Sequence, residues 1–307
     1  MPSLAQAGRG VALAAIAGLG IYRPAADAPS ARRVTGSDLT GVSYRVQAEQ
    51  GVNTASLAAG AARAALQAGG VNPADIEMII VGTTTPDVLW PTTACLVQNE
   101  LKLPMVASFD LYAAETSLLA ALNVGIRYIA GGARSVLLIG ADSDNQLVDL
   151  PGQSGSVHSR SAAAAVLTQA GGDGGVLSTM AGGAARPDGV GDASDRTVLQ
   201  GLTDGATECL QKANLSLSDI DLVIGEQSAP EIMQAWSKIA GIAASRLLLD
   251  PARYGGLRAA APLTALHDAI KEGRLQNGMT ALVLACGSGP TWAGACLRWG
   301  GGGLAEC

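Results

Sequence analysis

The stretch AALQAGGVNPADIEMIIVGTTTPD, residues 64–87, decides the fold because the chain contains a second copy of it. That copy is ECLQKANLSLSDIDLVIGEQSAPE, residues 208–231, and the two align without a gap. Asp75 matches Asp219, which sets the offset at 144 residues (219 − 75). Each copy has the pattern of an amphipathic helix, a short loop, a buried strand and a turn, so the chain is predicted to be an internal duplication.

A second pair of segments supports the duplication. ARSVLLIGADS, residues 133–143, matches GMTALVLACGS, residues 278–288, at an offset of 145 (278 − 133). Strands this apolar, separated by helices, are typical of sheets that helices cover on both faces. The sequence therefore predicts an α/β fold of two halves, residues 1–180 and 181–307. The Gly-, Asp- and Pro-rich stretch 181–196 is expected to be a loop, either a linker between them or a cover over a pocket.

Composition limits the class of partner. The 307 residues are 48% hydrophobic and 15% charged, with a net charge of −6 and no run of Lys or Arg. This balance argues against nucleic acid and anionic membranes and leaves small molecules or proteins as partners. The apolar run 10–22 is too short to cross a bilayer and lacks a cleavage site, so we expect a buried first strand and a soluble, cytoplasmic protein.

Cysteine and histidine usage gives no sign of a metal or a cofactor. Five cysteines without paired spacing indicate neither a disulfide framework nor a zinc site. His158 is expected to be a surface or hydrogen-bonded residue, and His267 is expected to face solvent from the charged side of a helix. The tail after Trp299 is expected to be frayed, which would make Cys307 the first thiol that iodoacetamide labels.

The segment FDLYAAETSLLAAL, residues 109–122, holds the main candidate for chemistry. It reads as a strand, a turn of small residues and a helix, with Glu115 near the helix N-terminus. Unpaired backbone N–H groups and the helix dipole favour negative charge at that place. By itself this pattern fits simple helix stabilisation as well as a functional acid.

Four segments, together with the duplication, resemble the ketoacyl-ACP synthase III family of the thiolase superfamily over residues 10–299. They are VGTTTPDVLWPTTACLVQNEL (81–101), FDLYAAETSLLAAL (109–122), SVLLIGADS (135–143) and LVLACGSGPTWAGACLRW (282–299). The resemblance implies a thiolase-like five-layered αβαβα fold and a homodimer in which the loop 88–91 reaches the partner's active site. Members use Cys, His and Asn to take an acyl group from coenzyme A or acyl carrier protein and condense it with malonyl-ACP. The apolar residues of TTACLVQ and SLLAALNV are expected to form the dimer surface.

The chain departs from the family pattern at each catalytic position. Glu115 stands where the nucleophilic Cys belongs, and Glu226, in GEQSA, stands where the general-base His belongs. Gly256 replaces the Asn in YGGLRAAAP, with Arg258 two residues further on. The glycine-rich GDGAG element is reduced to SRSAA, and Glu231 occupies the place of a basic residue for carrier-protein docking. With the coenzyme A motif reduced to TGVSYRV, both acyl-thioester donors remain open as partners.

The two glutamates define the predicted chemistry. A carboxylate cannot replace a thiolate as acyl carrier because the mixed anhydride would be too labile. Glu115 and Glu226 are expected to face one another, share a proton and act as a general acid/base pair. Cys95, in a predicted helix, and the strand thiols Cys286 and Cys296 are expected to be inert. Compatible reactions are cyclisation, dehydration, decarboxylation, hydrolysis and direct acyl transfer.

Two functions remain open from the sequence. In the first, the protein is a repurposed acyltransferase-like enzyme of polyketide or other natural-product biosynthesis that uses Glu115, Glu226 and Arg258. Arg258 would either bind an oxyanion or carboxylate, or form a salt bridge to one of the glutamates. In the second, the chain is a catalytically silent partner subunit of an active synthase.

Overall fold

Two β-sheets form the centre of the protein. The computed structural model describes residues 12–23, 52–143, 160–172, 174–184, 195–287 and 290–307. The first sheet has the order β11-β1-β5-β4-β2-β3 and the second the order β6-β10-β9-β7-β8. The first consists of β1 (Ala15–Tyr22), β2 (Met78–Gly82), β3 (Ala107–Leu111), β4 (Ser135–Asp142), β5 (Ser161–Thr168) and β11 (Gly303–Glu306). The second consists of β6 (Gly175–Gly183), β7 (Leu222–Ile224), β8 (Leu247–Leu248), β9 (Thr280–Gly287) and β10 (Thr291–Arg298).

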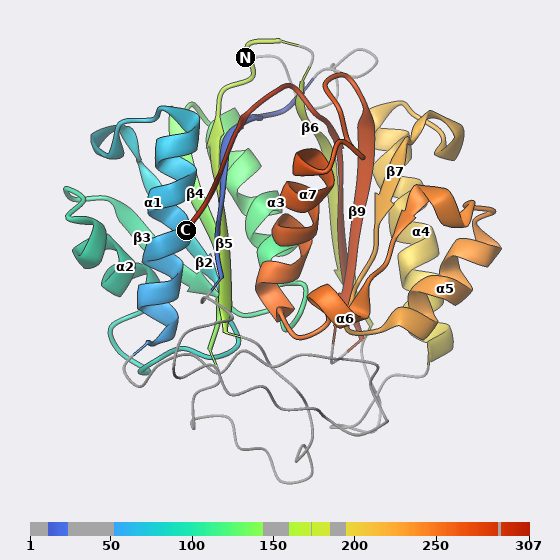
Figure 1. Ribbon diagram of the computed structural model, residues 1–307, viewed down its shortest axis with the longest axis horizontal. Helices are drawn as coiled ribbons and strands as arrows, with labels where there is room; N and C mark the ends of the chain where they lie inside the picture. Colours follow the sequence, from blue (N-terminus) through green and yellow to red (C-terminus); the bar gives the residue numbers. More distant parts are fainter. Residues whose placement is uncertain (1–11, 24–51, 144–159, 173, 185–194, 288–289) are drawn as a thin grey trace, which may run out of the picture.

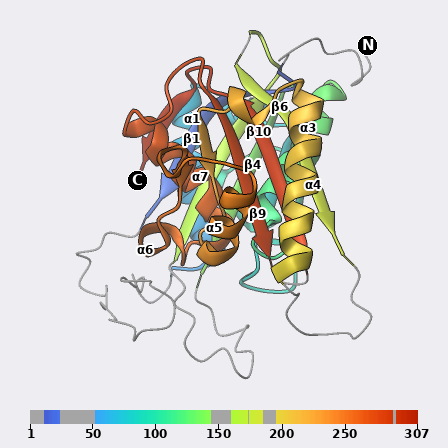
Figure 2. The ribbon, with the colours of Figure 1, turned by 90° about the vertical axis from the view of Figure 1, so that its right-hand side faces the viewer.

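Helices cover both sheets, which confirms the expected thiolase-like five-layered αβαβα arrangement. Helices α1 and α2 lie outside the first sheet, α3 and α7 lie between the sheets, and α4 and α5 lie outside the second (Figures 1 and 2). The helices are α1 (Thr54–Gly69), α2 (Thr93–Leu101), α3 (Ser117–Ala130), α4 (Asp195–Ala213), α5 (Pro230–Ile239), α6 (Pro251–Tyr254) and α7 (Ala261–Lys271). Within the described part of the chain, no helix is long and apolar enough to cross a membrane.

The duplication extends to the backbone angles. Gly70 and Asn214, 144 residues apart, both adopt the left-handed region with φ values of 59° and 58°. Ala114 and Arg258, also 144 apart, do the same with φ values of 49° and 46°. Residues other than glycine rarely adopt this region, so matching exceptions at one offset identify the same turn in both halves. The second pair precedes α3 and α7, the two central helices.

The central helices are buried on most of their surface. Leu118, Leu119 and Leu122 of α3 lie in the core between the two sheets. The expectation that SLLAALNV presents an apolar dimer surface is therefore wrong, because the apolar side chains of a helix enclosed between two sheets pack in the core of the same chain.

Helix α1 packs closely on the first sheet because both surfaces consist of small side chains. Asn53 caps the helix by accepting a hydrogen bond from Ser56 N, and Gly70 ends it in the left-handed conformation. A Cβ atom on Gly20 of β1 would lie 2.2 Å from Ala65 N of the helix. Glycine at this position allows the helix backbone to approach the strand.

The chain end is ordered, contrary to the expectation of a frayed tail. Strand β11 (Gly303–Glu306) pairs in parallel with β1 and becomes the outermost strand of the first sheet. Gly301, with φ of 84°, makes the turn that redirects the chain after β10. Strand β6 (Gly175–Gly183) spans residue 180, where the sequence placed the boundary between the two halves, and belongs to the second sheet.

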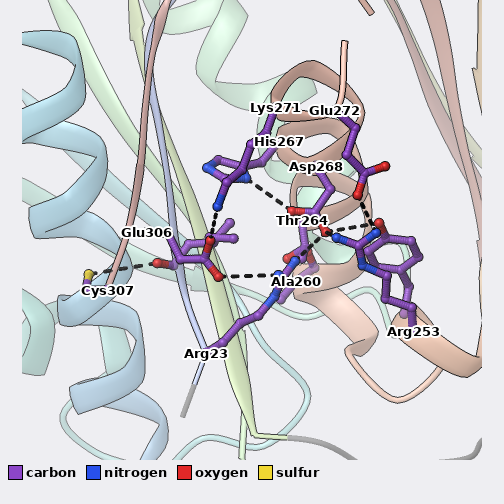
Figure 3. Close-up of polar contacts among 12 residues, drawn as sticks. Arg23, Arg253, Ala260, Thr264, His267, Asp268, Lys271, Glu272, Glu306 and Cys307 are labelled. Atoms are coloured by element: carbon purple, nitrogen blue, oxygen red, sulfur yellow. Dashed lines mark hydrogen bonds and ion pairs between the residues drawn. The ribbon is translucent and has the colours of Figure 1, made fainter. Parts of the chain in front are cut away.

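An ion-pair cluster connects strand β11 to α7 and α6. The Asp268 carboxylate, which is 2% exposed, lies 2.6 Å from the guanidinium groups of both Arg23 and Arg253 (Figure 3). His267 is 1% exposed and lies against the same carboxylate, so the expectation that it faces solvent is wrong. Glu306 of β11 pairs with Arg23 and with Lys271.

Asp268 makes this cluster a determinant of acid stability. Burial alone would raise the pKa of Asp268, but the His267 hydrogen bond and the charges of Arg23 and Arg253 outweigh it and lower that pKa to about 2. The stabilisation is therefore present above the ordinary value of 3.8 and is lost as pH falls through about 2.

We expect Asp268→Asn to lower the free energy of unfolding by about 2 kcal/mol at pH 7. The difference from wild type should shrink as the pH is lowered towards 2, because the wild-type carboxylate is then neutralised as well. Urea unfolding between pH 2.5 and 7 measures this. A difference that stays constant with pH would mean that packing, and not charge, explains the loss.

Candidate active site

The first site residue lies in a tight turn between β3 and α3. Ala114 has the left-handed conformation, and Ser117 N donates to Ala114 O at 3.1 Å. The Ser117 hydroxyl closes the same turn, because it donates to Ala114 O and accepts from Ala113 N. Glu115 therefore extends from a fixed turn directly before a helix N-terminus, as the sequence predicts.

The Glu115 side chain lies over Gly287, the last residue of β9. A Cβ atom at position 287 would be 2.5 Å from Glu115 Oε2 and 3.1 Å from Glu115 N. Any larger residue at 287 would push the carboxyl group away. Glycine at this strand end is thus what leaves space for Glu115, and the glutamate of one half contacts a strand of the other.

The second carboxyl group follows β7 and is buried. Glu226 is 3% exposed, and its Oε1 accepts hydrogen bonds from Gln227 N (2.9 Å), Ser228 N (3.0 Å) and Ser228 Oγ (2.8 Å). No donor in the described part of the chain reaches Oε2. Because three donors hold Oε1 as an acceptor, a proton on this group resides on Oε2.

The environment of Glu226 favours that proton. Burial raises its pKa, the negative charge of Glu115 raises it further, and the Ser228 and Gln227 hydrogen bonds oppose both effects, giving a pKa of about 7. The charge of Glu115 therefore reaches Glu226, while the expectation that the two act as a pair stays a prediction. A group that titrates near neutrality can donate or accept a proton at working pH.

The described thiols differ in their surroundings. Burial and the charges of Glu226 and Glu115 raise the pKa of Cys286 far above its ordinary value, so this thiol beside the site stays protonated. The Ser108 and Thr92 hydroxyls lower the pKa of Cys95, whereas desolvation raises that of Cys307. The expected inertness of Cys95 stays a prediction, although its hydrogen bonds lower the pKa of this thiol.

Arg258 occupies the corresponding turn of the second half. Its Nη1 donates to Thr84 Oγ1 at 3.1 Å, and its charge acts on Asp142, which is 2% exposed at the end of β4. Asp142 accepts from Thr84 N at 2.7 Å and from Ala259 N at 3.0 Å. Burial raises the Asp142 pKa against these hydrogen bonds. Both sequence-based roles of Arg258 stay predictions.

Sequence reasoning missed Asp142 and Thr84, although the duplication offered a signal. Asp142 corresponds to Gly287 at the offset of 145, and Ala259 corresponds to Glu115 at the offset of 144. One half therefore carries its carboxyl group on the turn and the other on the strand end. His158 lies outside the described residues. Among the described residues, no three His, Cys, Asp or Glu side chains are grouped as metal ligands would be.

The tryptophans do not form one wall of a site. Trp236, a residue of α5, is 1% exposed and packs in a core cluster with residues of α4 and β9. Trp292 packs against the same cluster, whereas Trp90 is 84% exposed. Packing is therefore the role of Trp236 and Trp292.

The pKa of Glu226 has a direct test. Its folded value of about 7 lies above the ordinary 4.5, so the native state binds the extra proton and stability falls as pH rises from about 4.5 to 7. We expect Glu226→Gln to be more stable than wild type above pH 7, by up to about 3 kcal/mol, with no gain below pH 4.5.

Glu115→Gln should lower the Glu226 pKa, measured by difference infrared spectroscopy of the carboxyl band. An unchanged pKa would show that the two groups are not coupled.

Comparison with known proteins agrees with the fold and extends it. Residues 210–299 match the 3-oxoacyl-[acyl-carrier-protein (ACP)] synthase III C-terminal family. The β-ketoacyl-[acyl-carrier-protein] synthase III of Xylella fastidiosa is 32% identical over 284 residues, covering 85% of this chain and 88% of the relative. That of Rhizorhabdus wittichii is 32% identical over 304 residues, covering 90% and 95%.

Solved structures show the same likeness. The 3-oxoacyl-[acyl-carrier-protein] synthase III of Aquifex aeolicus superposes with a TM-score of 0.81 at 29% identity, covering 93% of this chain and all of the other. The priming β-ketosynthase of the R1128 polyketide pathway, at 22% identity, covers 98% of this chain with a TM-score of 0.81 and shows the same fold. With its duplicated halves, central helices and paired turns, the chain belongs to the β-ketoacyl-acyl-carrier-protein synthase III family.

Proposed function

We propose that this protein is a synthase III-like enzyme in which a glutamate pair, and not a cysteine nucleophile, performs acid/base chemistry. Glu115 and Glu226 take the places of the family's Cys and His, and Gly256 takes the place of the Asn. The reaction is a cyclisation, a decarboxylation or a direct acyl transfer that needs no acyl-enzyme. Arg258 assists by binding negative charge on the substrate.

The observation that carries this proposal is the state of Glu226. A carboxyl group that is 3% exposed, has a pKa raised to about 7 and keeps one oxygen that no described donor reaches is suited to proton transfer. If Glu226 only filled the place of a lost residue, a second acid nearby would bring no benefit, because two crowded carboxyl groups destabilise the fold.

The absence of a competent thiol at the site supports the same reading. Cys286 is the described cysteine that responds to both glutamates, and its raised pKa keeps it protonated. Cys95 belongs to α2 and bonds to Ser108 on β3, away from the turn that carries Glu115. Acyl transfer through a cysteine is therefore not the chemistry we propose.

The proposed substrate is a small molecule or an acyl thioester of coenzyme A or acyl carrier protein. Relatives named for acyl-carrier-protein substrates and a structural neighbour from a polyketide pathway support this class. We place the enzyme in polyketide-like biosynthesis and in the cytoplasm, without a cofactor.

The alternative is a catalytically silent partner subunit. Loss of all three catalytic residues together favours it, and the fold is compatible with both functions. Co-purification with a cysteine-bearing homologue, combined with inactivity of the isolated chain on every acyl donor, would favour this alternative.

We expect Glu115→Gln and Glu226→Gln each to lower turnover by about 10²- to 10⁴-fold, because each removes a proton-transfer group. The double variant should lose far less than the product of the two, since the groups act as a unit. The substrate is first identified by mass spectrometry of ligands retained on the purified protein.

Glu208→Gln is the matched control, because this exposed α4 glutamate pairs with Lys212 far from the turn. It should keep wild-type turnover. Intact-protein mass spectra should show no acyl adduct after incubation with acyl-CoA or acyl-ACP. Full activity in both site variants, or a stable adduct on the wild type, would refute the mechanism.

We also propose a homodimer, formed through the loop 88–91 that the family resemblance places at the partner and not through the buried helix α3. Leu89, Trp90 and Tyr112 are 75%, 84% and 74% exposed, and Tyr112 directly follows β3, which is an edge strand among the described residues. Apolar side chains of this size, next to an unpaired strand edge, favour contact with another chain.

Sedimentation should give twice the 30.7 kDa of the chain at micromolar concentration. Leu89→Asp should shift the equilibrium towards monomer, because a charge there would be desolvated on pairing. Ile239→Asp, at an α5 side chain that is 65% exposed, is the control and should not. A wild-type mass near 30.7 kDa at all concentrations would exclude the dimer.

A further inference from the structure

A buried hydroxyl group lies beside Glu115 without a partner. Thr291 is the first residue of β10 and stands opposite Gly287 in the β9–β10 register. Its Oγ1 is buried and has no hydrogen-bond partner in the described part of the chain. A buried hydroxyl without a partner is costly, so each such group in a native protein calls for an explanation.

The position of this hydroxyl relates it to Glu115. The point where a Cβ on Gly287 would stand is 3.2 Å from Thr291 Oγ1 and 2.5 Å from Glu115 Oε2. Both oxygens therefore lie on the same side of the strand. Directly opposite residues in an antiparallel pair also share one face, which here is the face towards the Glu115 turn.

Glu226 adds a second group without a partner. Its Oε1 is held by three donors, whereas no described donor reaches Oε2. An apolar acyl chain packed against these groups would leave both the Thr291 hydroxyl and Glu226 Oε2 unpaired. A ligand hydroxyl could accept from Thr291 or Glu226 and donate to the Glu115 carboxylate.

We propose that Thr291 is a third polar residue of this site and that, with Glu115 and Glu226, it binds a hydroxyl group, that of an alcohol substrate or of water. The inference rests on the proposed function and refines it. It favours direct transfer of an acyl group to an alcohol, or hydrolysis, over reactions of purely apolar groups. In either reaction the hydroxyl oxygen forms a bond to the acyl carbon and the thioester C–S bond breaks. The hydroxyl proton passes to one glutamate, and the other glutamate donates its proton to the sulfur, which leaves as a thiol.

The test compares Thr291→Val, which removes the hydroxyl at nearly constant shape, with Thr291→Ser, which keeps it. In the assay used for the glutamate variants, Thr291→Val should lower kcat/KM for the acyl acceptor by about 10- to 100-fold, and Thr291→Ser should stay within about threefold of wild type. The melting temperature of Thr291→Val should be unchanged or higher, since no internal hydrogen bond is lost.

Thr54→Val is the control for the stability arm. The buried Thr54 hydroxyl bonds to Thr85 O and to Ser143 Oγ, both at 2.6 Å, so its loss should lower the melting temperature. A fall of about 3 °C or more in Thr291→Val would mean that its hydroxyl has an internal partner, and would overturn the inference.

A crystal structure gives a readout that needs no substrate, with water as the probe. Wild type and Thr291→Ser should hold an ordered water about 3 Å from the hydroxyl and from a carboxyl oxygen of the pair, and Thr291→Val should not. If the glutamate variants are inactive while Thr291→Val keeps full activity, the inference fails and the proposed function stands. If the glutamate variants are active, the proposed function fails, and presence or absence of this water then decides the role of Thr291.

Discussion

The structure depends on a reciprocal contact in which the turn of each half packs against a strand end of the other. The turn that carries Glu115 lies over Gly287, and the turn that carries Arg258 places Ala259 N on Asp142. Both turns require a left-handed residue, which fixes the direction in which the chain enters the central helices. Because the two contacts are equivalent, the halves must associate in one orientation for either site to form.

The same symmetry explains why the two halves differ in chemistry. In one contact the carboxyl group comes from the strand, and Asp142 uses its oxygens for donors of the protein itself. In the other contact the strand contributes only Gly287, and the space holds the Glu115 side chain. A carboxyl group held by several backbone and hydroxyl donors is structural, whereas one that feels the charge of a second acid is suited to proton transfer.

The charges around the buried Asp268, beside the C-terminal strand β11, act in the opposite direction from those around Glu226. Around Asp268, two arginines offset the cost of burial and hold the carboxyl group ionised, with a pKa of about 2. Around Glu226, burial and a neighbouring carboxylate act in the same direction, and the pKa rises to about 7. Two buried acids in one fold thus serve different purposes, one stabilising the packing of β11 and α7 and the other poised between protonation states.

The sequence by itself determined the duplication, the layered α/β fold and the placing of Glu115 at a helix N-terminus, because these follow from local hydrophobic period and from repeats. It also predicted that Glu115 and Glu226 meet, through the family resemblance. Only the tertiary structure decided the burial of His267, the pairing of the tail as β11, and the groups around the site: Gly287, Asp142 and Thr291. These depend on contacts between residues far apart in the chain, where packing and desolvation outweigh the local pattern that sequence reasoning can read.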